Sequence, residues 1–294
     1  MKHTQLSGIS IIIWSAVAIA ATETEIKPLD TSRIVTLSGA ITETVFALGA
    51  GDRVVGVDVS SSYPDTVNQL PKVAYHRRLS AEGVLSLAPT LVIATSESGP
   101  PEAVQQLEQA GVALLIVPYK PTVESTLAKI ERIATALGTK EAGDALIART
   151  RGELDQARLA HPTEEAKSRV LFIYARSQGT LMVAGQGTGA DAIIALAGGI
   201  NAAQGYVDYK PLTTEAVIAA APDVILLMDS GLESIGGPEG LWQLPGLSLT
   251  PAGKQGRVLS LDGLLLLGFG PRLGQAALAL NRSLYANSKV HGRE

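Results

Sequence analysis

The sequence predicts an α/β protein built from two similar α/β lobes, joined by a single long helix and with a ligand cleft between them. Three observations support this prediction. One pattern of apolar, acidic and proline positions occurs once in each half, short apolar runs alternate with amphipathic segments in both halves, and a long charged segment without proline lies between the halves. Alternating strands and helices are typical of α/β architecture.

The repeated pattern covers residues 79–93 and 212–226. The two stretches, LSAEGVLSLAPTLVI and LTTEAVIAAAPDVIL, align without a gap, and each residue lies 133 positions before its counterpart, as Leu79 does before Leu212. In both copies a Ser or Thr precedes a short helical segment, a proline ends it and an apolar strand follows. The acidic positions of the two copies are Glu82 and Glu215.

The N-terminal lobe is expected over residues 32–138 and the C-terminal lobe over 168–286. Short apolar runs of the kind buried in parallel sheets predict strands at 34–37, 54–57, 91–94, 114–117, 170–174, 224–227 and 258–261. Apolar residues at intervals of three and four, or runs closed by glycine, predict helices at 42–48, 127–137, 190–196 and 275–284.

The connecting helix is expected over residues 139–162. The stretch 140–160 is charged, rich in Ala and Leu, and free of proline, and the pair His161-Pro162 ends it because proline disfavours a helical residue before it. We interpret it as one helix that spans both lobes. The alternative is a surface helix of the N-terminal lobe alone.

The first 20 residues have the pattern of a cleaved signal peptide. Lys2 and His3 precede an apolar run, and Ala18-Ile19-Ala20 is a small-x-small cleavage pattern; an uncleaved membrane anchor is the alternative. The chain has no cysteine, which excludes disulfides and a lipobox cysteine for lipid attachment. We therefore expect a periplasmic protein. The formal net charge of −4 gives no basic field for nucleic acid.

No catalytic motif of the hydrolase, metalloprotease or phosphate-loop type is present, so we expect a protein that is not an enzyme. The segment Gly185–Ala190 matches a loose dinucleotide-binding fingerprint, which leaves a nucleotide-dependent oxidoreductase as an alternative of another class. The simpler interpretation is a glycine-rich helix start with Asp191 in the first turn, where a carboxylate complements the helix dipole.

The strongest local constellation is Tyr75-His76-Arg77, in a connection just before the first copy of the repeat. A cation near a phenol favours the phenolate, and a phenolate is a known axial ligand of haem iron. The alternative is a surface tyrosine followed by a solvated basic run. For Glu82 and Glu215 the structural alternative is interaction with the helix dipole, and the functional one is that each lobe presents a carboxylate to the same partner.

Four segments in order give the sequence a resemblance to a known family: Tyr75–Gly83, Met182–Asp191, Tyr209–Thr213 and Leu267–Arg272. The chain resembles the two-lobed metal-chelate binding proteins that serve ABC importers for haem, siderophores and cobalamin. Within that group it is similar to the periplasmic haem-binding proteins of bacterial haem uptake. The resemblance covers residues 33–280.

The resemblance implies a carrier that takes haem from an outer-membrane receptor and delivers it to an ABC permease dimer. Tyr75 would be the axial haem ligand, and Glu82 and Glu215 would dock on the two permease subunits. Further haem contacts are expected from Arg77, His76, Arg176, Tyr209, Lys210 and Arg272. Some relatives add a histidine after the first strand of the second lobe, and this chain has none there, so neither a second axial ligand nor a second stacked haem is expected. A siderophore or corrinoid carrier of the same fold is the alternative ligand class.

Overall fold

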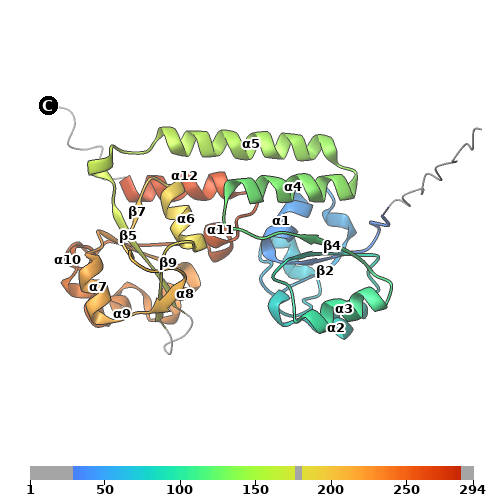
Figure 1. The fold of residues 1–294 in the computed structure, drawn as a ribbon, viewed down its shortest axis with the longest axis horizontal. Helices are drawn as coiled ribbons and strands as arrows, with labels where there is room; N and C mark the ends of the chain where they lie inside the picture. The colour runs from blue at the N-terminus through green and yellow to red at the C-terminus, as the bar shows by residue number, and fades with distance from the viewer. Residues whose placement is uncertain (1–28, 176–180, 286–294) are drawn as a thin grey trace, which may run out of the picture.

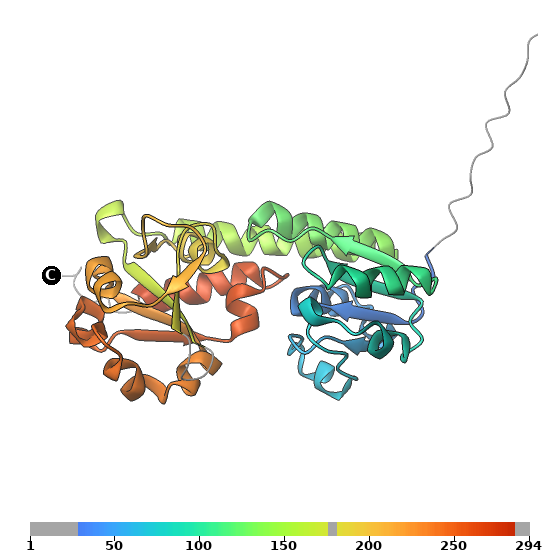
Figure 2. The same cartoon turned by 60° about the horizontal axis from the view of Figure 1, so that its bottom comes forward.

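The computed structural model describes residues 29–175 and 181–285, and it forms two α/β lobes backed by long helices (Figure 1). The proposed signal peptide and Arg176 lie outside the described residues. Figure 2 shows the same two lobes from a second direction, again with the long helices running along both. Among the described residues, no helix combines the length and apolarity needed to cross a membrane.

The N-terminal lobe is built on a parallel four-stranded sheet with the order β2-β1-β3-β4. Its strands are β1 (Ile34–Leu37), β2 (Val54–Val57), β3 (Leu91–Thr95) and β4 (Ala113–Val117). Every residue of β1 and β3 is buried, as expected for a parallel sheet covered on both faces. The helices are α1 (Gly39–Ala47), α2 (Ala81–Leu85), α3 (Pro101–Gln109) and α4 (Val123–Leu137).

The C-terminal lobe has a mixed sheet with the order β10-β9-β5-β6-β8, in which β7 also pairs with β5. Its strands are β5 (Arg169–Ala175), β6 (Leu181–Ala184), β7 (Ile200–Asn201), β8 (Tyr209–Pro211), β9 (Val224–Met228) and β10 (Val258–Leu261). Strand β6 pairs antiparallel with β5 and β8, an arrangement that the apolar runs did not predict.

The remaining elements complete the lobes and their connection. The other α-helices are α5 (Lys140–Leu159), α6 (Gly189–Leu196), α7 (Thr214–Ala220), α8 (Asp229–Ser234), α9 (Gly237–Gln243), α10 (Pro251–Gln255), α11 (Gly263–Leu267) and α12 (Leu273–Tyr285). Short 3-10 turns are η1 (Gly51–Arg53), η2 (Asp65–Gln69), η3 (His76–Arg78), η4 (Glu164–Ala166) and η5 (Leu247–Leu249).

The repeated sequence pattern folds into the same unit in both lobes. Ser80 caps α2 by accepting a hydrogen bond from the backbone of Gly83, as Thr213 caps α7 from Ala216. The residue before each proline adopts a left-handed backbone, with φ 45° at Ala88 and 41° at its counterpart. The helix, the turn before the proline and the following strand therefore have the same local structure in both lobes.

An arginine at the start of the first strand secures each copy. Arg33 donates to the carbonyls of Leu87 and Ala88 at 2.6 and 2.9 Å. Arg169 donates to the carbonyl of Ala220 through Nε at 3.3 Å and Nη2 at 2.9 Å. In each lobe the end of the repeated helix is thus tied to the neighbouring central strand.

Helix α5 lies along both lobes (Figure 1), because it packs against α4 of the N-terminal lobe and α12 of the C-terminal lobe. The predicted fold class, α/β with two lobes and one long connecting helix, is confirmed. The expected boundaries, 32–138, 139–162 and 168–286, stay predictions.

The loop between α11 and α12 carries hydrogen bonds from one lobe to the other. The carbonyl of Phe269 accepts from Thr126 Oγ1 at 3.0 Å and from Lys129 Nζ at 2.9 Å, both on α4. The carbonyl of Pro271 accepts from Thr150 Oγ1 of α5 at 3.1 Å. Burial lowers the pKa of Lys129 to about 8, opposed by the nearby carboxylate of Glu43.

The same loop contributes a buried ion pair. Arg272 donates through Nε and Nη2 to Oε1 of Glu43, which lies on α1, and its guanidinium stacks 3.7 Å from the ring centre of Tyr63. The side chains of Glu43 and Arg272 are 3% and 16% exposed. Burial raises the pKa of Glu43, and Arg272 works against that rise. We call the contacts of Arg272 and Phe269 with the N-terminal lobe, together with that of Pro271 with α5, the interlobe lock.

The interlobe lock predicts that Arg272→Ala destabilises the protein by about 3 kcal/mol or more, because it leaves the buried carboxylate of Glu43 without its partner. Urea unfolding measures this loss. The control is Lys140→Ala, which removes an exposed pair with Asp144 and should leave the unfolding midpoint unchanged. Equal midpoints for wild type and Arg272→Ala would contradict a stabilising lock.

Candidate functional site

Tyr75 lies at the carboxyl side of the N-terminal sheet, immediately before η3. Its backbone is extended, with φ −81° and ψ 131°, and its side chain is half-buried. The segment is held to the loop after β3 by two backbone hydrogen bonds, from Gly99 N to His76 O at 2.9 Å and from Leu79 N to Gly99 O at 2.7 Å. The phenol is therefore carried by a fixed turn.

His76 supports Tyr75 from behind and is itself held by a buried carboxylate. The two rings are 4.5 Å apart at their centres, and His76 Nδ1 lies 2.9 Å from Asp58 Oδ2. Asp58 also accepts from the hydroxyls of Ser60 at 2.7 Å and Ser61 at 2.8 Å. Burial alone would raise the pKa of Asp58, but the hydrogen bonds from His76 and the two serines lower it below its usual value.

Arg77 is engaged by an acidic residue that the sequence analysis did not single out. Its Nη2 lies 2.5 Å from Oε2 of Glu97, in the loop after β3. Burial disfavours the charged guanidinium, but Glu97 outweighs that effect and raises the pKa of Arg77. The pair is half exposed, so an incoming anion can compete with Glu97 for the guanidinium at modest cost.

Three further tyrosines are linked to this position or to one another by electrostatic interaction or ring contact. Tyr119 follows β4, while Tyr174 of β5 and Tyr209 of β8 belong to the other lobe, with ring centres 5.8 Å apart. Burial raises the pKa of Tyr209 to about 12, with contributions from Tyr119 and Tyr174 and opposition from Arg77. Groups of both lobes therefore lie within electrostatic range of one another.

Tyr119 interacts electrostatically with Tyr75, Arg77 and Glu97. Burial raises its pKa first, Glu97 and Tyr75 add to the rise, and Arg77 opposes it. Tyr119 and Tyr209 accordingly remain protonated at neutral pH. We call Tyr75, Arg77, Tyr119, Tyr174 and Tyr209 the interlobe set. Its aromatic rings and single guanidinium suit a flat, largely apolar ligand that carries negative charge.

The other predicted contacts lie elsewhere. Arg272 is part of the interlobe lock, and Lys210 lies on β8 with its Nζ 5.0 Å from the ring centre of Tyr206. Successive residues of a strand point to opposite faces, so Lys210 and Tyr209 do not share one. Arg176 lies outside the described residues.

Glu82 and Glu215 are exposed in the first turns of α2 and α7. Both helices lie on the side of the molecule away from α5 (Figure 1). The matched sequence positions are thus matched surface positions, one on each lobe.

The glycine-rich segment 185–190 leads into α6 and satisfies its own polar groups. Thr188 caps the helix by accepting from Asp191 N at 3.1 Å, and the Asp191 carboxylate accepts from Gly187 N at 3.0 Å and Asn201 Nδ2 at 2.9 Å. The chain's own carboxylate thus accepts a backbone N–H at this helix start, which is where helices bind anions. The simpler interpretation as a helix start accounts for this segment.

Within residues 29–175 and 181–285, no group of three or more His, Cys, Asp or Glu residues could hold a metal ion.

Four residues near the candidate site were not predicted as site residues: Asp58, Glu97, Tyr119 and Tyr174. One rule could have found them. Each lies at or just after the carboxyl end of a strand: β2, β3, β4 and β5 respectively. In open α/β sheets, ligands bind at the carboxyl ends of the strands. The first polar or aromatic residues after each apolar run were therefore candidates.

The sequence of this chain matches a known protein family. The model of the periplasmic binding protein family matches residues 34–264. The chain belongs to the periplasmic binding protein family. The sequence-based resemblance is thereby confirmed.

Several solved structures of high similarity are those of periplasmic haem-binding proteins. The chain is 49% identical to the periplasmic haem-binding protein RhuT from Roseiflexus sp. RS-1 in apo form, with a TM-score of 0.84. The match covers 87% of this chain and 98% of RhuT. The chain is 48% identical to the periplasmic haem-binding protein BhuT in complex with two haems, with a TM-score of 0.82 and coverage of 86% and 98%. Among curated relatives, a vitamin B12-binding protein of Vibrio cholerae is 28% identical over 207 residues, 70% of this chain and 74% of that protein.

The Asp58 hydrogen bonds predict that Asp58→Asn lowers stability at pH 7 by about 2 to 3 kcal/mol. Since the folded state lowers the pKa of Asp58, this contribution is present above the unfolded value near 3.8 and is lost as pH falls through the folded value. Urea unfolding from pH 7 to pH 3 should show wild type and variant converging. Asp144→Asn, in an exposed pair, is the control; a difference that does not shrink at low pH would contradict the prediction.

Proposed function

We propose that this protein is a periplasmic carrier that binds haem between its lobes, with Tyr75 as the axial ligand of the iron, and passes the haem to an ABC permease dimer. The observation that supports this best is the interlobe set, in which phenols of both lobes lie within electrostatic range of one guanidinium. The haem-binding relatives at 48% and 49% identity support the same ligand class.

In this proposal each residue has a physical role. Tyr75 gives its phenolate oxygen to the iron, and Arg77, released from Glu97, stabilises the phenolate or pairs with a propionate. His76, which Asp58 holds, limits the orientations open to the Tyr75 ring. The rings of Tyr119, Tyr174 and Tyr209 supply apolar contact area with hydroxyl groups at the edge.

Export of the protein, supply of haem and delivery to the permease involve other parts of the chain. Residues 1–20 direct export and are then removed, and an outer-membrane receptor supplies the haem. Glu82 and Glu215 meet basic residues of the two permease subunits, one from each lobe. Arg176 and Lys210 remain proposed rim contacts, whereas a propionate would reach Arg272 only if the pair with Glu43 opened.

Haemin titration of the protein lacking residues 1–20 tests the ligand. Wild type should give a tight complex with the charge-transfer band of phenolate-bound ferric haem, and Tyr75→Phe should lose that band and weaken binding at least tenfold. Tyr285→Phe is the matched control, because Tyr285 bonds to Gly198 and Ser168 within the C-terminal lobe. Identical spectra for wild type and Tyr75→Phe would reject Tyr75 as the ligand.

The same titration addresses two alternatives. A corrinoid carrier, suggested by the vitamin B12-binding relatives, would bind cyanocobalamin more tightly than haemin and would tolerate Tyr75→Phe. Saturation at two haems, the number in the BhuT structure, would show a second site that this chain builds without the missing histidine.

Docking is tested by removing the matched carboxylates. Glu82→Ala with Glu215→Ala should abolish haem-dependent stimulation of the reconstituted permease, while haemin affinity stays within twofold of wild type. Each single variant should show an intermediate loss, since each lobe supplies one anchor. Full stimulation by the double variant would reject these residues as anchors.

A further inference from the structure

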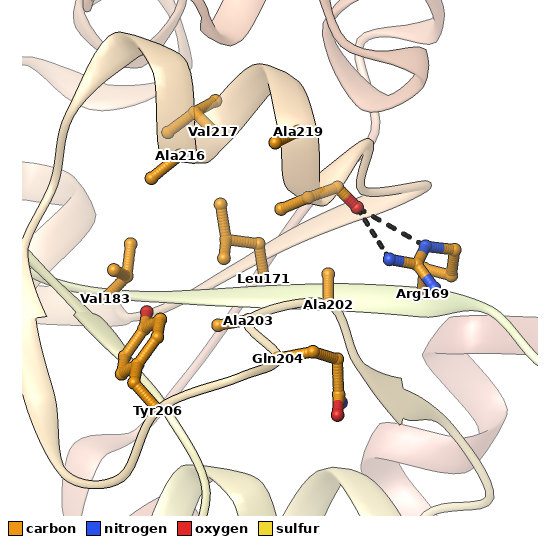
Figure 3. A pocket seen from close by; sticks show the side chains of 11 residues that line it. Arg169, Leu171, Val183, Ala202, Ala203, Gln204, Tyr206, Ala216, Val217 and Ala219 are labelled. Carbon is orange, nitrogen blue, oxygen red and sulfur yellow. Dashed lines mark hydrogen bonds between the residues drawn. The ribbon is translucent and has the colours of Figure 1, made fainter.

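The C-terminal lobe contains a cavity of about 330 Å³ between α7 and the strands β5 and β6 (Figure 3). Its floor is formed by buried apolar side chains, among them Leu171 and Val217, each 1% exposed. Its rim is exposed and includes Gln204 and Ala219. The cavity therefore has a dry floor and an opening to solvent, and its volume is in the range of small-molecule sites.

The duplicated fold unit provides an internal comparison for this space. Leu87 of the N-terminal copy packs against the core cluster that contains Val35. Its counterpart 133 positions later is Ala220, which lines the cavity next to Leu171 of β5. The three alanines of α7 that line the cavity, Ala216, Ala219 and Ala220, correspond to Gly83, Ser86 and Leu87, so only Ala220 stands where the other copy has a larger apolar side chain. The repeated unit therefore accepts either a leucine or an alanine at this position.

Two polar groups at the cavity lack partners among the described residues. The Tyr206 hydroxyl is buried and unpaired, which costs free energy unless a ligand or water satisfies it. Arg169 uses Nε and Nη2 on Ala220, and its Nη1 has no hydrogen-bond partner in the described part of the chain. Figure 3 shows Tyr206 and Arg169 on opposite sides of the cavity, with Leu171 between them.

We propose that this cavity binds a small aromatic hydroxy acid. The carboxylate meets the free edge of the Arg169 guanidinium, the ring lies on the apolar floor, and the hydroxyl at the far end pairs with Tyr206. None of the cavity residues belongs to the interlobe set, so the site is separate from the proposed haem site and does not depend on it.

Isothermal titration of the protein lacking residues 1–20 with 4-hydroxybenzoate and benzoate tests the proposal. Wild type should bind 4-hydroxybenzoate at submillimolar concentration and prefer it to benzoate by about fivefold, the worth of one hydrogen bond. Tyr206→Phe should lose the preference while still binding both acids. Haem is left out of the titration, so the result is independent of haem binding.

Filling the cavity locates the site. Ala220→Leu copies the residue of the other lobe and should weaken 4-hydroxybenzoate binding at least tenfold, whereas Ala142→Leu on the exposed face of α5 should not. If Ala220→Leu melts far below wild type, Ala219→Leu at the exposed rim takes its place. Absence of binding to wild type at millimolar acid, or unchanged binding by the filled variant, would overturn the proposal.

Discussion

The interlobe lock, the contacts of the 269–272 loop with α1, α4 and α5, holds the two lobes at a fixed separation. One loop places two carbonyls on hydroxyl and ammonium donors of α4 and α5, and next to them a guanidinium on a buried carboxylate. Separating the lobes here would remove Arg272 from Glu43 and the Phe269 carbonyl from Lys129, and breaking a buried ion pair is costly. The lock, together with α5 packed along both lobes, opposes a wide hinge motion.

A fixed separation of the lobes has a consequence for the ligand. The interlobe set must be close to its binding geometry before the ligand arrives, since large closure is opposed, and preorganised sites lose less free energy to ordering. The local supports fit this requirement: Asp58 holds His76 behind Tyr75, and backbone bonds to Gly99 hold the turn. Only Arg77, in a half-exposed pair with Glu97, has a partner that a bound anion could easily replace.

Much of this could be predicted from the sequence, because the decisive signals are local. Fully buried strands such as β1 and β3 are apolar runs. The capped helix with a following proline has the same sequence pattern in both halves. Strands β6 and β8 were missed because they are held by antiparallel pairing with their neighbours, and β8, Tyr209–Pro211, has no apolar run of its own. The Glu43–Arg272 pair joins residues 229 positions apart, a contact that no local spacing reveals.

The two copies of the repeated unit separate what the fold requires from what it does not. Caps at Ser80 and Thr213, left-handed alanines before the prolines and an arginine clamp occur in both, and they account for the path of the chain. Glu82 and Glu215 also occur in both, but they are exposed, and interaction with a helix dipole is worth only about 0.3 to 1 kcal/mol. Their recurrence in both copies is therefore not accounted for by stability, and the docking role proposed above would account for it. Ala220, where the other copy has Leu87, shows the reverse: the fold accepts different side chains there, and in the C-terminal lobe the alanine lines the cavity beside α7.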